Sequence, residues 1–134
     1  MNDTISVDEV RDACKNSLHF LCTQMLHYKD WDLVHDDTEK FLSRPSMKKA
    51  LLLPRDHLKT SMVTIGKSIQ FILENPNVRI LIANQIWDFA RKILGEIKGH
   101  LEDKSQLPEL FGSFVSHSWP ADSIIVRQRT KSHK

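Results

Sequence analysis

Apolar residues that recur every three or four positions predict two helices in the first third of the chain. The first begins at Ser6-Val7-Asp8-Glu9, a capping-box match in which the serine and glutamate side chains bond to each other's backbone N–H groups, and it runs to about residue 28. The second covers about 32–43. It ends at Arg44-Pro45, because the residue before a proline avoids helical dihedral angles.

The same periodicity predicts two later helices. One spans about Thr60 to Glu74 and is stopped by Asn75-Pro76-Asn77. The other starts at a cap on Asn84 and continues to about residue 101. The residues predicted to face inward from the first of these helices are Met62, Ile65, Ile69, Ile72 and Leu73.

Short apolar runs with few polar interruptions predict three strands, over 50–53, 78–83 and 123–127. Such runs are typical of strands that are buried on both faces of a parallel sheet. The first strand, the helix after it and the second strand have the length of a βαβ unit with a right-handed crossover. Residues 103–118 are expected to be irregular.

The segment 48–62 carries the main candidate chemistry, because Lys59 and Thr60 stand where a predicted strand and turn give way to a helix. Unpaired N–H groups at a helix start carry partial positive charge and favour an anion. A lysine adds a full charge to outer phosphates, and the next hydroxyl can hold Mg²⁺. In the pattern G-x-x-x-x-G-K-[ST], however, Leu53 and Leu58 fill the glycine positions, so an ordinary exposed helix start is the alternative.

Composition indicates about one soluble globular domain, with 134 residues, 40% hydrophobic and 27% charged. A net charge of +2 excludes a chain that is basic throughout. No apolar run approaches the ~20 residues that span a bilayer, and the polar start is not that of a signal peptide. Cys14 and Cys22 fit neither a disulfide framework nor a zinc spacing, so we expect reduced, half-buried thiols and a cytosolic protein.

Two further groups of residues have both a functional and a structural interpretation. His19, His27 and His35, with Asp36 and Asp37 nearby, suggest a metal site, but the histidines are more than two helical turns apart and a solvated helix surface is favoured.

The basic end of the chain is the second such group. It could contact DNA phosphates by counterion release, and a solvated tail is the favoured alternative. Its residues are Arg127, Arg129, Lys131 and Lys134.

Four motifs, taken in chain order, carry a resemblance to a known family. Pro54-Arg55-Asp56-His57-Leu58-Lys59-Thr60 resembles a deviant phosphate loop, Pro-Arg-Gly-His-x-Lys-Ser/Thr, and 75–82 resembles the strand that follows it. Residues 96–111 resemble the next helix and loop, and 119–129 resemble the segment ahead of an acidic strand. The family is the large subunit of tailed-bacteriophage terminases, the DNA-packaging ATPase.

The resemblance implies an α/β fold, the three-layer P-loop NTPase fold of the ASCE or RecA-like type, here incomplete and preceded by an N-terminal helical pair. It divides the chain into an N-terminal helical segment, 1–45, and a partial ATPase domain, 46–134, which ends before the acidic Walker B strand. No apolar run followed by an acidic pair lies downstream of Lys59, so hydrolysis by this chain alone is not expected.

The resemblance also implies roles for individual residues. Lys59 would contact the β- and γ-phosphates of ATP, Thr60 would ligate Mg²⁺, and Arg55 would stabilise charge at the γ-phosphate. Asp56 stands where the family has glycine, which places a carboxylate near the phosphates. The implied catalytic residues are therefore Arg55 and Lys59, and the implied ATP-binding residues are Arg55, Asp56, His57, Leu58, Lys59, Thr60 and Ser61.

As part of such a motor, the chain would bind ATP and double-stranded viral DNA in the host bacterial cytoplasm, in a ring at the procapsid. Its implied partners are the terminase small subunit and the portal protein, and no membrane. Two alternatives stay open: a non-catalytic interaction or DNA-binding module, and a fragment of another P-loop ATPase such as a helicase.

Overall fold

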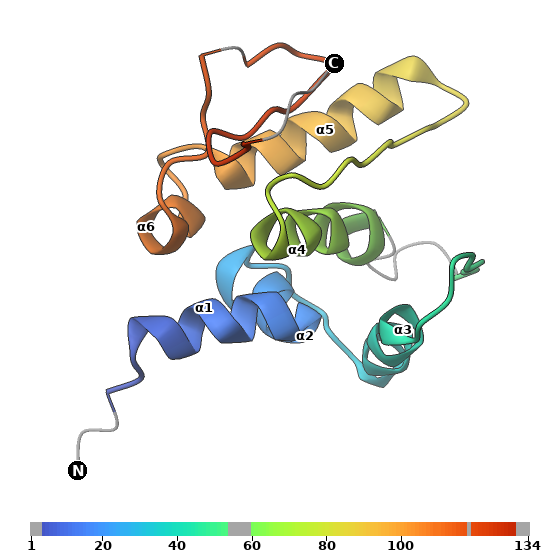
Figure 1. The fold of residues 1–134 in the computed structure, drawn as a ribbon. Coiled ribbons are helices and arrows are strands. Elements are labelled where there is room, and N and C mark those ends of the chain that lie inside the picture. Colours follow the sequence, from blue (N-terminus) through green and yellow to red (C-terminus); the bar gives the residue numbers. More distant parts are fainter. Residues whose placement is uncertain (1–3, 54–59, 118, 131–134) are drawn as a thin grey trace.

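The computed structural model describes residues 4–53, 60–117 and 119–130, and within these ranges the chain is helical (Figure 1). Two of the helices, η1 and η2, are π-helices, and η2 runs directly into α4 to form a continuous helix 60–74. In chain order the elements are α1 Val7–Asn16, α2 Leu18–Phe20, η1 Leu21–Met25, α3 Leu33–Ser43, η2 Thr60–Gly66, α4 Lys67–Glu74, α5 Trp87–Leu101 and α6 Leu107–Phe111.

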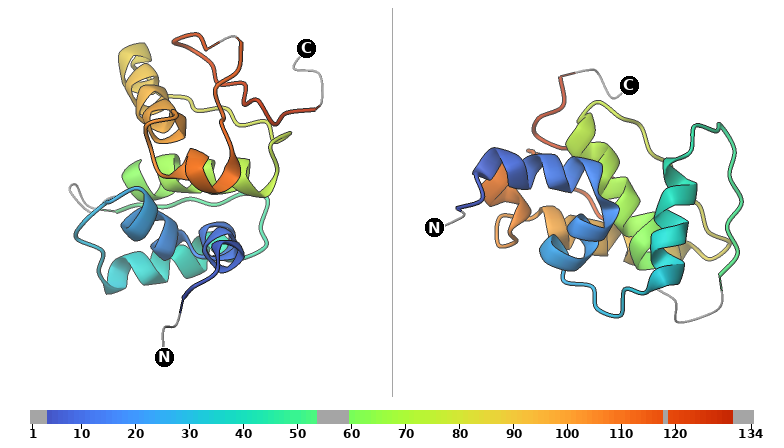
Figure 2. Two further views of the ribbon diagram at one scale, coloured as in Figure 1. Left: turned by 90° about the vertical axis from the view of Figure 1, so that its left-hand side faces the viewer. Right: turned by 90° about the horizontal axis from the view of Figure 1, so that it is seen from below.

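Helix 60–74 forms the middle of the molecule. The N-terminal helices α1, α2 and α3 lie on one side of it and α5 lies on the other (Figure 1), an arrangement that the turned views confirm (Figure 2). Ile65 and Ile69 from the middle helix meet Leu21 from the N-terminal side and Ile97 and Leu101 from α5 in one buried cluster. The predicted inward face of helix 60–74 is confirmed, since Met62, Ile65, Ile69 and Leu73 are buried and Ile72 packs against the core.

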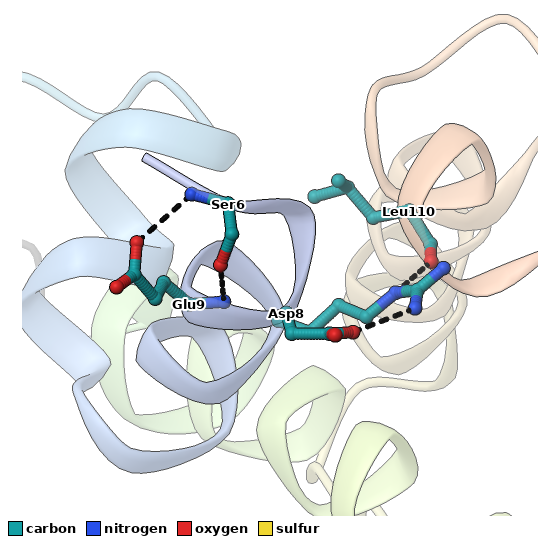
Figure 3. Close-up of polar contacts among 5 residues, drawn as sticks. Ser6, Asp8, Glu9 and Leu110 are labelled. Carbon is teal, nitrogen blue, oxygen red and sulfur yellow. Dashed lines mark hydrogen bonds and ion pairs between the residues drawn. The ribbon is translucent and has the colours of Figure 1, made fainter. Parts of the chain in front are cut away.

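The amino terminus of α1 is held by the predicted capping box. The Glu9 N–H donates to Ser6 Oγ over 3.2 Å, and the Ser6 N–H donates to Glu9 Oε2 over 2.8 Å (Figure 3). From the same turn, Arg11 bridges Asp8, at 3.2 Å, and the backbone oxygen of Leu110, at 2.5 Å. The guanidinium therefore ties the start of the chain to α6.

The first predicted helix is interrupted at Ser17, which has extended dihedral angles (φ −121°, ψ 110°). Its hydroxyl accepts from the N–H of Phe20 over 3.1 Å, and the N–H of Leu18 donates to Glu39 Oε1 over 2.7 Å. Serine competes with helical bonding by capping locally, and here it starts a second helix. The next predicted helix is confirmed within a residue, because α3 spans Leu33–Ser43.

The last helices differ from the prediction at their starts. α5 begins at Trp87 rather than at 84, because Asn84 Oδ1 accepts from the N–H of Ile86 over 2.9 Å and holds a turn there. Helix α6 lies in the region that was expected to be irregular; Pro108 stands in its first turn, where a missing N–H costs no bond. Leu107, at its first position, is buried in the core.

The predicted α/β three-layer P-loop fold is wrong for this structure: the described residues contain no strand and no sheet. A strand forms only where a neighbouring backbone supplies a ladder of hydrogen bonds. Residues 78–83 are instead joined to the C-terminal segment through side chains, as Arg129 Nη1 donates to the Val78 oxygen over 3.2 Å and the Thr130 N–H donates to Asn77 Oδ1 over 2.9 Å.

The other two predicted strands also lack a ladder within the described residues. One backbone bond, from the Arg127 N–H to the Phe114 oxygen over 3.0 Å, fastens the 123–127 segment. Residues 50–53 are not buried on both faces, since Leu52 is 94% exposed. An apolar run therefore identified segments that avoid helix, without supplying the partners that would make them strands.

Candidate functional site

Thr60 and Ser61 are the predicted site residues that the structure describes. They are the first described residues of helix 60–74, with Thr60 exposed and Ser61 half-buried, and a helix is present over the predicted range 60–74. The leading N–H groups of a helix have no partner within it and favour an anion. The other predicted site residues lie outside the described residues: Arg55, Asp56, His57, Leu58 and Lys59.

Close packing through Gly66 fixes this helix start against the N-terminal segment. A Cβ atom at Gly66 would lie 2.5 Å from Cys22 Sγ, 3.2 Å from the Ser61 oxygen and 3.3 Å from Leu18 Cδ1. Any larger residue would push η2 away from the helices before it. The position of the candidate phosphate-binding turn thus depends on a glycine one turn further along.

A polar cluster lies against the same turn and centres on Tyr28. The Tyr28 hydroxyl donates to Glu96 Oε1 over 2.5 Å and lies 3.1 Å from His100 Nε2, and the two rings meet edge to face at 5.7 Å. The Tyr28 ring packs against the small buried cluster that contains Met62 of η2. The segment that follows η1 and helix α5, far apart in the sequence, therefore meet at the Tyr28 hydroxyl.

The protons of this cluster can be assigned from its geometry. A phenol has one proton and two lone pairs, and the proton is directed at the Glu96 carboxylate. His100 must then donate to the Tyr28 oxygen, which requires the proton of His100 on Nε2. Two partners on α5 therefore orient the Tyr28 hydroxyl.

Burial and charge keep the cluster in that protonation state near neutral pH. Burial raises the pKa of Tyr28, and the hydrogen bond to Glu96 and its negative charge raise it further. Burial lowers the pKa of His100, opposed by Glu96 and reinforced by His27. Tyr28 is therefore a neutral hydrogen-bond donor, and His100 is a neutral imidazole.

Sequence reasoning missed this cluster, although the chain contains features that point to it. Tyr28 is the only tyrosine of the chain and stands where the first predicted helix ends. Glu96 and His100 stand four apart on the predicted fourth helix, a spacing that puts them on one face. The long-range contact to Tyr28 depends on the tertiary packing and could not be read from these spacings.

Two of the three histidines singled out in the sequence, His19 and His35, pack against the same ring, that of Trp31. His19 stacks on Trp31 at 4.9 Å, and the Trp31 and His35 rings lie 5.6 Å apart. The expectation of a solvated surface is wrong for His35, which is 3% exposed and accepts from the Asp32 N–H over 2.8 Å as part of the α3 cap. Within the described ranges, no group of His, Cys, Asp or Glu is arranged to hold a metal ion.

Cys14 and Cys22 are free thiols, as predicted, and are more deeply buried than expected. Burial raises the pKa of Cys14 to about 11. It raises that of Cys22 to about 12, with a further contribution from Glu39. Neither thiol is suited to nucleophilic chemistry, because the reactive form is the thiolate.

A pocket of about 350 Å³ lies between α5 and the irregular segments 78–82 and 122–126. Apolar side chains such as Ile82, Leu94 and Ile124 line it, together with charged groups at its edges, and neither Thr60 nor Ser61 is among its lining residues. Next to it the chain leaves large apolar side chains exposed, namely Ile80, Leu81, Ile86, Trp87 and Phe89.

The basic end is only partly a free tail. Arg127 is exposed, whereas Arg129 and Thr130 are bonded to Val78 and Asn77. The solvated-tail interpretation is therefore wrong for Arg129, which fastens the segment to the body of the molecule. Lys131 and Lys134 lie outside the described residues.

Comparison with known proteins gives no match to a family model, to a curated protein or to a solved structure. In the described part of the chain, no helix has the length and apolar character needed to cross a bilayer.

Proposed function

We propose that this chain binds Mg²⁺-ATP at the start of helix 60–74 and is the ATP-binding N-terminal portion of a terminase large subunit. The observation that supports this proposal is a helix over 60–74, whose residue Thr60 directly follows Lys59 in the sequence. The site needs helix amides, an ammonium group and a hydroxyl, and does not itself require a sheet beneath them.

Each proposed role follows from the chemistry of the residue. Lys59 would neutralise the outer phosphates, Thr60 would hold Mg²⁺, and Arg55 would stabilise charge at the γ-phosphate. The backbone of 56–61 would cradle the phosphate oxygens. In this role the chain works in the host cytoplasm at the procapsid, with viral DNA, the small subunit and the portal protein as partners.

Calorimetric titration of Mg²⁺-ATP into the wild type and into Lys59→Ala tests this function. Loss of a charge-assisted bond should weaken binding by about 10- to 100-fold. Lys104→Ala is the matched control, because Lys104 is an exposed lysine beyond the end of α5 and should leave affinity unchanged. Equal binding by wild type and Lys59→Ala, or no binding by either, would contradict the proposal.

A second function, a non-catalytic interaction module, is favoured by the exposed apolar surface formed by Ile80, Leu81, Ile86, Trp87 and Phe89. A surface of this kind, next to an apolar pocket, is typical of a contact with another polypeptide. Sedimentation velocity over a range of concentrations tests it. Association that is abolished in Leu81→Lys/Trp87→Lys and unaffected by ATP or Lys59→Ala would support this function, and a monomer at all concentrations would remove its support.

A further inference from the structure

The pocket between α5 and the segments 78–82 and 122–126 has the properties of a small-molecule site. Such sites are concave, largely apolar, and carry a few polar or charged groups that orient the ligand. This pocket has a volume of about 350 Å³, an apolar lining and charged side chains at its edges. Neither Thr60 nor Ser61 lines it, so it is separate from the proposed nucleotide site.

The body of the pocket is formed by aliphatic side chains from three parts of the chain. Ile72 comes from α4, Leu94 and Ile97 come from α5, and Ile82 and Ile124 come from the two irregular segments. A methylene group occupies roughly the volume of a water molecule in the liquid, about 30 Å³. The volume of about 350 Å³ therefore has room for an apolar chain of about ten carbons, whose burial the hydrophobic effect favours.

The charged residues at the pocket are mostly arginines. Among the described residues that line it, Arg79, Arg91 and Arg129 are basic and Asp122 alone is acidic. Arg129 is held in place, because its Nη1 donates to the Val78 oxygen over 3.2 Å. Arg91 is exposed on α5 and makes no ion pair within the described ranges. A positive edge beside an apolar interior is complementary to a ligand with an apolar body and a negative end.

We propose that this pocket binds a small amphipathic anion, an unbranched apolar chain with a carboxylate or a phosphate at one end. The chain lies along α5 between the two irregular segments, and the arginines at the edge hold its anionic end. A guanidinium is suited to either head group, because its planar fork of N–H donors matches the oxygen atoms of both. This inference does not depend on ATP binding and can succeed or fail without it.

Calorimetric titration with decanoate, decyl phosphate and decyltrimethylammonium tests the class of ligand. These compounds share one chain and differ in the charge of the head group, and each is used below the concentration at which it forms micelles. We expect saturable binding of at least one anion, and binding of the cation that is weaker by about fivefold or more. The anion that binds more tightly identifies the head group. No saturable binding of either anion, or equal binding of the cation, would overturn the inference.

Reversing one charge at the edge tests the role of the arginines. Arg91→Glu should weaken binding of the preferred anion about tenfold and strengthen binding of decyltrimethylammonium. Arg127→Glu is the matched control, because Arg127 is exposed and is not among the lining residues, and it should change neither affinity by more than about twofold. If Arg91→Glu weakens the anion and the cation equally, the arginine does not select for charge and the inference is wrong.

Filling the pocket tests where the ligand lies. Ala90 lines the pocket from α5, so Ala90→Phe places a ring in the space assigned to the chain and should weaken binding about tenfold or more. Ala83→Phe makes the same change at an exposed position outside the lining and should leave the affinity unchanged. Thermal unfolding of the same samples shows whether each variant is folded. Undiminished binding by folded Ala90→Phe would overturn the inference.

A measurement on the wild type locates the ligand without relying on a filled variant. Trp87 lines the pocket, whereas Trp31 packs against the small buried cluster around Met62. In ¹⁵N-labelled protein the indole N–H resonance of Trp87, assigned with Trp87→Phe, should shift during the titration with the dissociation constant found by calorimetry. That of Trp31 should not move. A Trp87 resonance that stays in place at saturating anion would overturn the inference.

Discussion

Helix 60–74 and the segment 78–89 are both rich in large apolar residues, but the structure treats them in opposite ways. The helix buries Met62, Ile65 and Ile69 to within 1% of full burial between the N-terminal helices and α5. The segment that follows leaves Leu81 91% exposed and Trp87 63% exposed. The number of apolar residues therefore does not decide burial in this chain.

What differs between the two regions is whether local geometry and available partners agree. In helix 60–74 the apolar residues recur at helical spacing, so they form one face, and other helices cover that face. In 78–83 nearly every residue is apolar, a pattern that suits a strand between other strands, and the described residues supply no strand to pair with it. An apolar pocket between this segment and α5 is the consequence.

The largest expected difference in stability is between two variants that each truncate one apolar side chain, one variant in each region. Ile69→Ala removes a fully buried side chain and should lower the free energy of unfolding by about 2–5 kcal/mol. Leu81→Ala removes a side chain that is mostly in water and should change it by less than about 0.5 kcal/mol. Urea denaturation followed by circular dichroism measures both. A Leu81→Ala cost near that of Ile69→Ala would show that 78–83 is packed in solution.

The second comparison uses glycines on two helices. Gly66→Ala places a methyl group against Cys22 Sγ and should cost about 1–3 kcal/mol of stability. Gly95→Ala on α5 meets nothing within 4 Å and should stabilise by about 0.5–1 kcal/mol through helix propensity. Thermal unfolding of the two variants should therefore shift in opposite directions.

A second background identifies the cause of the Gly66 effect. Cys22→Ala removes the sulfur atom that the new methyl group would contact, so Gly66→Ala should cost less in Cys22→Ala than in the wild type. If the cost is the same in both backgrounds, the contact with Cys22 is not what makes glycine necessary, and the backbone oxygen of Ser61 becomes the candidate.

The sequence predicted the helices well because each has a local cause. The capping box at Ser6, the stop at Asn75 and the inward face of helix 60–74 all depend on residues within a few positions of one another. The prediction of a three-layer sheet was wrong, because a strand depends on partners elsewhere in the chain. Apolar runs in 50–53, 78–83 and 123–127 could not show whether such partners exist.

The same distinction between local and long-range causes applies to the candidate site. The helix that carries Thr60 and Ser61 was predictable from the hydrophobic pattern after Lys59. The meeting of Tyr28 with Glu96 and His100 was not predictable, because residues separated by 68 and 72 positions meet only in the folded molecule. The prediction for His35 was wrong for a related reason. This side chain takes part in the N-cap of α3 and lies against Trp31, and spacing alone did not indicate these contacts.

Substitutions at helix caps should change stability by a smaller amount. They again allow the packed and the exposed regions to be compared. Ser6→Ala should cost α1 about 1 kcal/mol, and Ser6→Gly only a few tenths, because the capping box is lost but the extended backbone is still accessible to glycine. The N-cap residue of α5, Ile86, makes no side-chain cap, so Ile86→Ser should stabilise this helix by about 0.5–1 kcal/mol. Denaturation midpoints measure both. A destabilised Ile86→Ser would mean that the half-exposed Ile86 side chain is packed after all.

The smallest expected effect is the pH dependence of the free energy of unfolding. It tests whether His100 packs α5 against the rest of the molecule. Burial lowers the pKa of His100 in the folded state, so the unfolded chain binds the proton more readily and the free energy of unfolding should fall as the pH drops below about 6.5. The groups that face His100 are Tyr28, Glu96 and His27, and of these Glu96 opposes the effect.

Unfolding free energies measured between about pH 5 and 8 for wild type, His100→Gln and His117→Gln would settle this point. His100→Gln should flatten the acid side of the curve, while His117→Gln, at an exposed position, should leave it as in wild type. The effect is small because His100 is only half-buried and water screens part of it. If His100→Gln follows the wild-type curve, the imidazole is solvated, the contact with Tyr28 is open in solution, and this part of α5 behaves like the exposed segment before it rather than like the core.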